Sequence, residues 1–363
     1  MTALLMTGFP GFLGSALLPR LLARRKGVRA ICLVQPQHMA TARRRVREIE
    51  AAHPHTLDRV ELVAGDITAP DLGVDPALRD GLQEVNEVWH LAAIYDLAVA
   101  REVAHRVNVE GTRQVLAFCQ SRPQFSRLQY VSTCYVSGAY DGEFTEDGLD
   151  EGQTFLNHYE STKFEAEMLV RTAMAAGLPA TVYRPGIVVG DSRTGETQKY
   201  DGPYFLAAFM QRQLQVAVIP AVGNVDRVKV SLVPRDFVIE AMDQLSVLDG
   251  SIGRTFALTD PNPPTVRELV DFFASHLGKR VIWVWLPLGI TRAAVGSVPG
   301  LERLLGLPAE ALDYFASPTT YSTANTVAEL SGTGLECPPF KSYAGRLLDF
   351  MVDHPEIGSS AMV

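Results

Sequence analysis

Cysteine is scarce in this sequence, and the spacing of the few that occur argues against two common architectures. The 363 residues contain four cysteines, which lie far apart and form no C-x-x-C pair: Cys32, Cys119, Cys134 and Cys337. A disulfide framework or a zinc site would need closer or paired spacing. The histidines are mostly isolated, and no carboxylate cluster stands beside them. We therefore expect free thiols, a reducing compartment and no metal site.

The sequence also lacks a hydrophobic run long enough to cross a bilayer. Its most apolar stretch, residues 281–290, contains Pro287 and is much shorter than the roughly 20 apolar residues that a membrane-spanning helix needs. The apolar residues 3–6 are expected to form the first strand, which leaves no room for a signal peptide before them. These features predict a cytoplasmic protein without a transmembrane segment.

Positive charge is in deficit, and one common hydrolase motif is missing. The formal net charge is −8, which argues against a nucleic-acid partner and against anionic lipid bound over the whole surface. No G-x-S-x-G nucleophile elbow occurs, which argues against a serine hydrolase of the α/β type. Hydrophobic residues make up 47% of the chain, enough for a sizeable core.

Short apolar runs alternate with amphipathic stretches through the first half of the chain. The strands are expected at residues 4–7, 30–34, 60–64, 87–91, 128–132 and 180–183, and the helices at 13–25, 39–52, 103–121 and 159–176. This alternation predicts an α/β fold with a Rossmann-type doubly wound parallel sheet.

The alternation becomes irregular after about residue 190. Helices are expected at 203–216, 235–245, 266–277 and 343–352, and strands at 228–233 and 255–259. We therefore expect an NADP-binding Rossmann domain of residues 1–190 plus about 229–260. Residues of about 191–228 and 261–363 are expected to form a smaller C-terminal lobe that binds substrate over the carboxyl edge of the sheet.

Three regularly spaced glycines follow the first expected strand. Gly8, Gly11 and Gly14 stand between the apolar residues 3–6 and the amphipathic stretch 13–25. A strand that leads through a glycine turn into a helix presents main-chain amides to a dinucleotide pyrophosphate. The spacing differs from the usual G-x-G-x-x-G, so the motif depends on support from elsewhere in the chain.

That support comes from a tyrosine and a lysine spaced four residues apart. Tyr159 and Lys163 lie in a helical stretch, and this spacing places them on one face, one turn apart. A nearby ammonium group is expected to lower the pKa of the tyrosine toward the range of general acid–base catalysis. Thr133, at the end of an expected strand, can donate a hydrogen bond from its hydroxyl group to a substrate oxygen.

Together these motifs resemble the extended short-chain dehydrogenase/reductase superfamily over most of residues 1–260. The resemblance implies that Thr133, Tyr159 and Lys163 are catalytic, with Thr133 rather than Ser132 at the hydroxyl position. It also implies a cofactor site of five segments in addition to Tyr159 and Lys163: Thr7, Gly8, Gly11, Phe12, Leu13 and Gly14 in the glycine turn, Asp66 and Ile67 at the adenine, Leu91, Ala92 and Ala93, then Asn108, and finally Pro185, Gly186 and Ile187 beside the nicotinamide.

Within the superfamily, the chain looks most like the fatty acyl-CoA and thioester reductase branch, also called the male-sterility type. Residues 108–115, 159–170 and 183–197 carry this likeness, and the last includes the distinctive run GDSRTG. The resemblance implies an oxidoreductase of lipid metabolism that reduces a fatty acyl thioester, bound to CoA or a carrier protein, either to the aldehyde or onward to the alcohol.

The end of the second expected strand bears on the choice of cofactor. NAD-dependent folds usually have an acidic residue there to hold the ribose, whereas this chain has Gln35. Arg43, Arg44 and Arg45 follow and could pair with a 2′-phosphate, so NADPH is preferred over NADH. The arginines can equally be the solvated face of a helix.

Several readings stay open. The alternatives to thioester reduction are an alcohol or ketone dehydrogenase acting on a sterol or hydroxy-lipid, and an NAD-dependent nucleotide-sugar epimerase. A third is a non-catalytic dinucleotide-binding protein. The set of Thr133, Tyr159 and Lys163 argues against this third alternative, because such a protein does not need catalytic residues. The resemblance suggests a homodimer.

The acidic segment 141–153 is expected to be a solvated loop or part of a lid. The stretch 281–290, with Leu301, Leu304, Leu305 and Leu307 beyond it, lines an acyl-chain tunnel, forms ordinary core or makes peripheral contact with a membrane.

Overall fold

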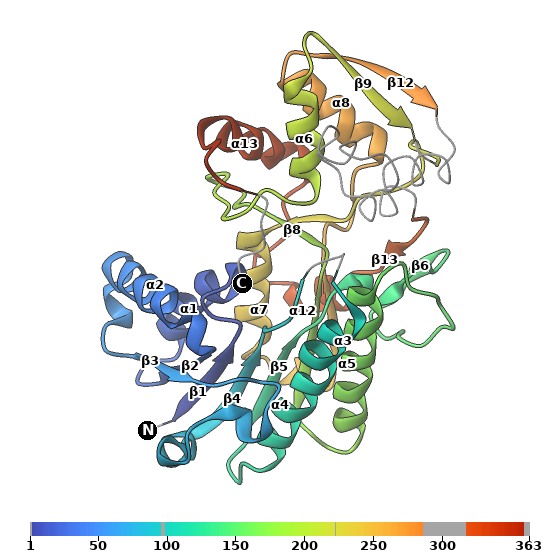
Figure 1. Cartoon of the computed structure of the whole chain (residues 1–363). Helices are drawn as coiled ribbons and strands as arrows, with labels where there is room; N and C mark the ends of the chain where they lie inside the picture. The colour runs from blue at the N-terminus through green and yellow to red at the C-terminus, as the bar shows by residue number, and fades with distance from the viewer. Residues whose placement is uncertain (1, 96–98, 222, 286–316, 359–363) are drawn as a thin grey trace.

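The computed structural model describes residues 2–95, 99–221, 223–285 and 317–358. At its centre is a seven-stranded sheet with the order β11-β7-β5-β4-β1-β2-β3 (Figure 1), in which every neighbouring pair is parallel. Its strands are β1 (Ala3–Thr7), β2 (Arg29–Val34), β3 (Val60–Ala64), β4 (Val85–His90), β5 (Arg127–Val131), β7 (Ala180–Pro185) and β11 (Thr255–Leu258).

The strand order reverses at β1, which pairs with β2 on one side and β4 on the other. The chain winds outward from β1 to β3, then crosses back to β4 and continues to β11. Because helices cover both faces, β1 and β7 are buried along their whole length and do not alternate between buried and exposed residues. This confirms the doubly wound Rossmann-type sheet. In sheets of this kind, ligands bind where the strand order reverses, so a ligand is expected at the carboxyl ends of β1 and β4.

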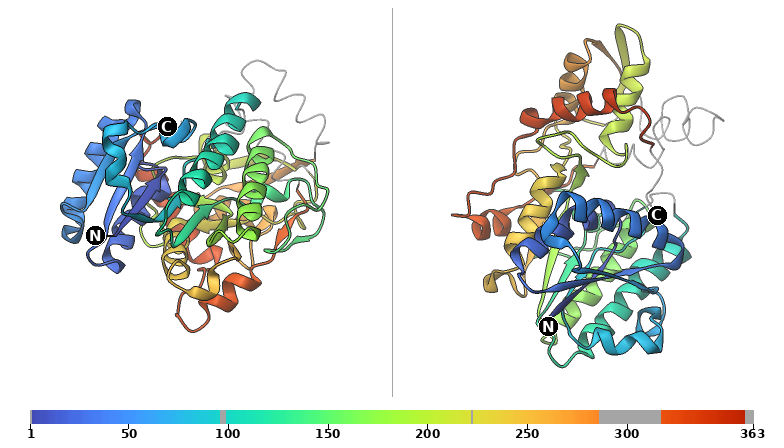
Figure 2. Two further views of the ribbon diagram at one scale, coloured as in Figure 1. Left: turned by 90° about the horizontal axis from the view of Figure 1, so that it is seen from below. Right: turned by 90° about the vertical axis from the view of Figure 1, so that its left-hand side faces the viewer.

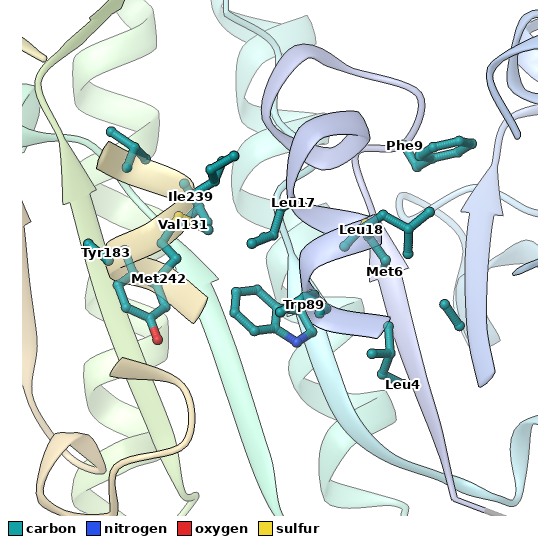
Figure 3. Packing of buried hydrophobic residues seen from close by; sticks show 14 of the residues in the cluster. Leu4, Met6, Phe9, Leu17, Leu18, Trp89, Val131, Tyr183, Ile239 and Met242 are labelled. Atoms are coloured by element: carbon teal, nitrogen blue, oxygen red, sulfur yellow. The ribbon is translucent and has the colours of Figure 1, made fainter. Parts of the chain in front are cut away.

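Helices pack on both faces of the sheet. One face is covered by α1 (Phe12–Arg24), α2 (Met39–Ala52) and α7 (Arg235–Leu245), and the other by α4 (Gly111–Gln120) and α5 (His158–Ala175). On the first face, Leu17 of α1 and Met242 of α7 are buried in one cluster with Trp89 and Tyr183 of the sheet (Figure 3). The rings of Trp89 and Tyr183 are stacked, with their centroids 6.3 Å apart.

A second group of elements lies beyond the carboxyl ends of the sheet, as Figure 1 and the right-hand view of Figure 2 show. It contains α6 (Pro203–Arg212), β9 (Val216–Ala221), α8 (Val266–His276), β12 (Arg280–Trp285) and α13 (Phe340–Asp353). These elements share a buried cluster that includes Met210, Phe273 and Leu347. The short strands β8 (Ile187–Val189) and β10 (Leu232–Pro234) pair in parallel between this group and the sheet.

Two expectations for this region need correction. The helix expected over 203–216 ends at Arg212, because the chain turns there into β9, which pairs with β12. The expected strand at 228–233 is ordered as a strand only from Leu232. Residues 280–285 of the apolar stretch form β12, whereas residues 286–290 and Leu301, Leu304, Leu305 and Leu307 lie outside the described residues.

The C-terminal part of the described chain returns to the sheet. β13 (Thr320–Tyr321) pairs with β6 (Glu143–Phe144), and α12 (Ala324–Leu330) follows it. The buried carboxylate of Glu146 accepts from the main-chain N–H of Ala257 at 2.8 Å and of Thr326 at 3.1 Å. The acidic segment 141–153 is therefore fixed to β11 and α12 at its centre. In the sheet region, the short helix α3 (Arg101–Ala104) precedes α4.

Among the described residues, no helix has both the length and the apolar character needed to cross a membrane.

Candidate active site

The glycine turn between β1 and α1 packs closely on itself and on the end of β4. Gly8 has a φ angle of +83°, and a Cβ atom there would lie 2.8 Å from the main-chain nitrogen of Ala92. At Gly11 and Gly14, a Cβ atom would lie 2.8 Å from the carbonyl oxygen of Gly8. Only glycine is compatible with these approaches. They hold the turn against the end of β4 directly before α1 begins at Phe12. The turn and the N-terminus of α1 therefore fit a dinucleotide pyrophosphate.

Thr7 and His90 form a hydrogen-bonded support behind this turn. The Thr7 hydroxyl accepts from the main-chain N–H of Ala92 at 3.1 Å and bonds Nδ1 of His90 at 2.8 Å. On the other side of the ring, Nε2 of His90 bonds the Thr112 hydroxyl at 3.0 Å, which donates to the carbonyl oxygen of Asn108 at 2.7 Å. These directions place the proton of the imidazole on Nε2. Burial lowers the pKa of His90 to about 3, and the charge of Lys163 adds to this, so His90 is neutral.

Asn108 connects the segment after β4 with helix α5. It lies in a π-helical turn (His105–Glu110) between α3 and α4, a feature that often marks functional sites. Its Oδ1 accepts from the main-chain N–H of Ile94 at 2.9 Å, and its Nδ2 donates to the Thr162 hydroxyl at 3.0 Å. Asn108 therefore orders Leu91, Ala92 and Ala93, which precede Ile94 at the predicted cofactor site.

The structure brings Thr133 and Tyr159 together. Thr133 follows β5 directly, and Tyr159 lies in the first turn of α5, where Asn157 caps the helix by accepting from the main-chain N–H of Glu160 at 2.9 Å. The side chains of Thr133 and Tyr159 share a hydrogen bond, and both residues are buried, at 5% and 6% exposure. Two hydroxyl groups thus meet at the carboxyl end of the sheet, where a substrate oxygen could be bound.

Lys163 lies one turn further along α5, but it bonds to β5. Its Nζ donates to the carbonyl oxygen of Val131 at 2.8 Å and to the hydroxyl of Tyr130 at 3.2 Å. Burial lowers the pKa of Lys163 to about 8, while the carboxylate of Glu167 opposes that shift.

The lowered pKa expected for Tyr159 is not what the structure shows. Burial raises the pKa of Tyr159, and the hydrogen bond from Thr133 only partly opposes this. The reason is that the tyrosine is enclosed, while the ammonium group of Lys163 is turned toward the main chain of β5. At neutral pH, Tyr159 is therefore protonated and can act as a hydrogen-bond donor.

The predicted adenine end of the site lies around the ends of β2 and β3. Asp66 follows β3, and its Oδ1 accepts from the main-chain N–H of Thr68 at 2.8 Å, which shapes the turn. Ile67 is buried, and a Cβ atom at Gly111 would lie 2.8 Å from its Cδ1. Arg43 is exposed on α2, one residue before Arg44, which is 3.8 Å from Glu48.

The predicted nicotinamide loop joins β7 to β8. Pro185 ends β7 and Ile187 begins β8. A Cβ atom at Gly186 would lie 2.4 Å from the carbonyl oxygen of Ser231, so the loop is held tightly against β10. The following GDSRTG run is tied to α7, because Ser192 donates from its main-chain N–H at 2.7 Å and from its hydroxyl at 2.6 Å to the carboxylate of Asp236.

Tyr159 has a neighbour, Tyr95, that the sequence analysis did not select, and an ion pair that it also did not select stands beside Tyr95. The ring of Tyr95 meets the ring of Tyr159 edge-on, with the centroids 5.1 Å apart. The Lys199 ammonium group lies 5.1 Å from the centroid of Tyr95 and 2.7 Å from the carboxylate of Asp201. Tyr95 is distant in sequence from both Tyr159 and Lys199, so no local pattern indicates these two ring contacts.

Glu167 is a fourth residue that the sequence analysis missed, although a signal for it was present. It follows Lys163 by four residues on α5, so Tyr159, Lys163 and Glu167 lie along one stripe of the helix. Its side chain is completely buried.

Comparison with known proteins places the chain in a family. A family model described as "Male sterility protein" matches residues 6–242, more than half of the chain. The protein belongs to this family. It is a branch of the extended short-chain dehydrogenase/reductase superfamily, an NAD(P)-binding oxidoreductase family, so the branch inferred from residues 108–115, 159–170 and 183–197 is confirmed.

Similar proteins occur among much longer chains. Glycine betaine reductase ATRR of Emericella nidulans is 29% identical over 282 residues, which cover 74% of this chain but 22% of that protein. Nonribosomal peptide synthetase asaC of Aspergillus flavus is 27% identical over 368 residues, which cover 91% of this chain and 35% of that one. The chain thus spans about a fifth to a third of the length of these relatives.

Solved structures show the same arrangement. The terminal R domain from the myxalamid PKS-NRPS biosynthetic pathway superposes with a TM-score of 0.84 at 29% identity, covering 98% of this chain and 91% of that one. A UDP-glucuronic acid 4-epimerase from Bacillus cereus, in complex with NAD, has a TM-score of 0.68 at 17% identity, with 99% of both chains covered. The epimerase shares the fold alone.

Proposed function

We propose that this protein is an NADPH-dependent reductase that converts an acyl thioester, carried by CoA or by a carrier protein, to the aldehyde. The observation that carries the proposal is the hydrogen-bonded pair of Thr133 and Tyr159 at the carboxyl end of the sheet that also carries the glycine turn, with Lys163 one turn away on α5. The similarity to the R domain of the myxalamid pathway, and to a protein named as a glycine betaine reductase, supports reduction as the reaction.

The chemistry of the pair suits reduction of a carbonyl group. When bound, the reduced nicotinamide supplies a hydride for the carbonyl carbon. The hydroxyl groups of Thr133 and Tyr159 donate hydrogen bonds to the carbonyl oxygen and stabilise the negative charge that develops on it. Because burial raises the pKa of Tyr159, its proton is in place for this task at neutral pH. Overall, thioester, NADPH and one proton give aldehyde, free thiol and NADP⁺.

The choice of NADPH follows from the surface around the predicted adenosine site. Gln35 follows β2 where an acidic residue would repel a 2′-phosphate, and Arg43 is exposed on the helix α2 that follows. A guanidinium group at this place can form charge-assisted hydrogen bonds with a phosphate. We assign Arg43 this role.

The substrate is proposed to enter from the side of Tyr95. This ring covers the edge of Tyr159 and is itself 44% exposed. The ion pair of Lys199 and Asp201 stands beside it, on the segment that leads from the nicotinamide loop into α6. We propose that the smaller lobe of about 191–228 and 261–363 sets substrate specificity through this segment.

A panel of carbonyl substrates tests the proposal. NADPH oxidation is followed with a long-chain acyl-CoA, the same acyl group on pantetheine, the matching aldehyde, a sterol ketone and a UDP-sugar. We expect oxidation with at least one thioester. Activity with the ketone but not with the thioesters would make the protein a ketone reductase. Conversion of the UDP-sugar with no net change in the cofactor would make it an epimerase.

A further inference from the structure

Glu167 is a completely buried carboxylate that the proposed chemistry does not use. Its Oε2 accepts from the hydroxyl of Ser132 at 2.6 Å, and its Oε1 accepts from Nη2 of Arg184 at 2.7 Å and from Nε of Arg171 at 3.0 Å. A buried charge is costly unless it is paired and hydrogen-bonded. Here both oxygens have charged or hydroxyl partners, so the ionised form is maintained. The neighbouring guanidinium groups hold the pKa of Glu167 below its usual value in spite of burial.

The partners of Glu167 are placed next to three predicted parts of the active site. Ser132 precedes Thr133 at the end of β5, and Arg184 precedes Pro185 at the end of β7. Glu167 itself stands one turn after Lys163 on α5. One carboxylate therefore connects the catalytic hydroxyl, the helix of Tyr159 and Lys163, and the nicotinamide loop.

The two arginines extend this connection to the segment that follows β6. Nη2 of Arg184 donates to the carbonyl oxygen of Gly148 at 2.7 Å, and Nη2 of Arg171 donates to that of Glu146 at 2.9 Å. Both guanidinium groups thus have several fixed partners and little freedom to turn away. A displacement of Glu167 would be transmitted to all of these elements, because packed and fully bonded networks deform together.

We propose that Glu167 is a positioning residue that fixes Thr133, the pair Tyr159 and Lys163, and the loop of Pro185 to Ile187 in their working arrangement. The inference rests on the proposed function, because it uses the roles assigned there to these residues. It adds a residue that acts through its neighbours and does not itself contact the substrate or the cofactor.

Glu167 also supplies negative charge close to Lys163. The charged groups around this pair are Arg171 on α5 and Arg184 on β7, while β5 contributes the hydroxyl of Tyr130 and β4 the neutral ring of His90. Arg184 also donates to the main-chain carbonyl oxygen of Glu146, whose carboxylate accepts hydrogen bonds from main-chain N–H groups of β11 and α12. With glutamine at position 167, Lys163 would lose the carboxylate charge that now raises its pKa. Its pKa, already lowered to about 8 by burial, would fall further.

The test compares Glu167→Gln with Glu165→Gln. Glu165 lies on the same helix, but it is 39% exposed and 3.5 Å from His105, so it controls for loss of one carboxylate from α5. For both variants and the wild type we would measure the thermal midpoint, the NADPH dissociation constant from pH 6 to pH 10, and the pH profile of kcat. Measurements are made well below the midpoint of the least stable variant.

We expect Glu167→Gln to lower kcat by about tenfold or more at pH 6.5, through misplacement of the reacting groups. Because the pKa of Lys163 falls in this variant, we also expect the inflection at alkaline pH, both in the NADPH dissociation constant and in kcat, to move down by about one pH unit. Glu165→Gln should match the wild type in both. A lower thermal midpoint with an unchanged pH inflection and kcat would make Glu167 a structural residue only and overturn the proposal.

A double variant covers the case in which Glu167→Gln does not fold. Glu167→Gln with Arg184→Met removes both charges of the buried pair, and replacement of such a pair by neutral groups is often tolerated. We expect it to fold, to lose kcat, and to show an inflection between those of the wild type and of Glu167→Gln. Wild-type kcat in the double variant would overturn the proposal. If the wild type reduces no thioester, the proposed function fails, whereas the pH dependence of NADPH binding still decides on Glu167.

Discussion

Lys163 donates a hydrogen bond to the carbonyl oxygen of Val131 at 2.8 Å, two residues before Thr133 in the chain. The contact fixes the start of α5 against the end of β5, the two elements that carry Tyr159 and Thr133. It also buries the ammonium group, so Lys163 titrates near pH 8 rather than near 10.5. Lys163 therefore both holds α5 against β5 and changes its charge in the alkaline pH range.

The buried lysine predicts that stability depends on pH in the alkaline range. Between pH 8 and pH 10.5 the unfolded chain binds more protons at this residue than the folded protein, so raising the pH favours the folded state. Relative to Lys163→Met, the wild type should gain at most about 3 kcal/mol of unfolding free energy between pH 7 and pH 10. Urea unfolding at several pH values measures this. A difference between the two proteins that stays constant with pH would contradict the assigned titration.

Replacing Tyr159 should separate catalysis from cofactor binding. Tyr159→Phe removes the hydroxyl that is bonded to Thr133, and we expect kcat to fall by about a hundredfold or more. NADPH binding, measured by nicotinamide fluorescence, should change by less than about twofold, or about 0.4 kcal/mol.

The control for this variant is Tyr343→Phe. The hydroxyl of Tyr343 is buried on α13 and has no hydrogen-bond partner among the described residues, so its removal should leave activity unchanged. Equal losses in both variants would point to a general effect on folding, and loss of NADPH binding in Tyr159→Phe would refute the division of roles.

The glycine turn predicts a contrast between two glycines that both have positive φ. Gly8→Ala would place a Cβ atom 2.8 Å from the main chain of Ala92. A Cβ atom at Gly27 would have no atom of the described residues within 4 Å apart from its own chain neighbours. Gly27→Ala should cost about 1 kcal/mol for the backbone conformation alone. Gly8→Ala should cost more and should also weaken NADPH binding. Thermal unfolding with and without NADPH measures both effects, and similar behaviour of the two variants would contradict the close packing at Gly8.

The role proposed for Arg43, contact with the 2′-phosphate of NADPH, predicts how its replacement changes the cofactor preference. Arg43→Ala should raise KM for NADPH about tenfold, a loss of about 1.4 kcal/mol, and leave KM for NADH nearly unchanged. Arg44→Ala is the matched control, because Arg44 lies 3.8 Å from Glu48. Steady-state kinetics of the wild type and both variants, with NADPH and with NADH, measures these KM values. Equal effects on NADPH and NADH would remove Arg43 from the phosphate site, and a wild type that prefers NADH would refute the choice of cofactor.

The parallel, doubly wound sheet could be predicted because its strands and helices give local signals. The six strands expected in the first half and the helix expected over 235–245 all occur, since each is a continuous apolar or amphipathic run bounded by turn residues. The glycine turn and the spacing of Tyr159 and Lys163 are local as well. Patterns of this kind can be recognised in a single sequence.

The remaining features depend on pairs that are distant in the chain. β12 pairs with β9, and β13 pairs with β6, across more than 50 residues, so neither pairing can be deduced from a local pattern. The edge contact of Tyr95 with Tyr159 is of the same kind. The pKa of Tyr159 was misjudged because the spacing on the helix indicates that Lys163 is near, but not that its ammonium group points to Val131.

The central claim is that the protein reduces a thioester, and the most direct test measures the two products together. Wild-type protein is mixed with NADPH and a long-chain acyl-CoA, and NADP⁺ and free CoA thiol are quantified over the same time course. The account predicts that NADP⁺ and thiol appear together, with one NADPH consumed per thiol if the aldehyde is released and two if it is reduced further, and that Tyr159→Phe forms neither. NADPH oxidation without thiol release would contradict it.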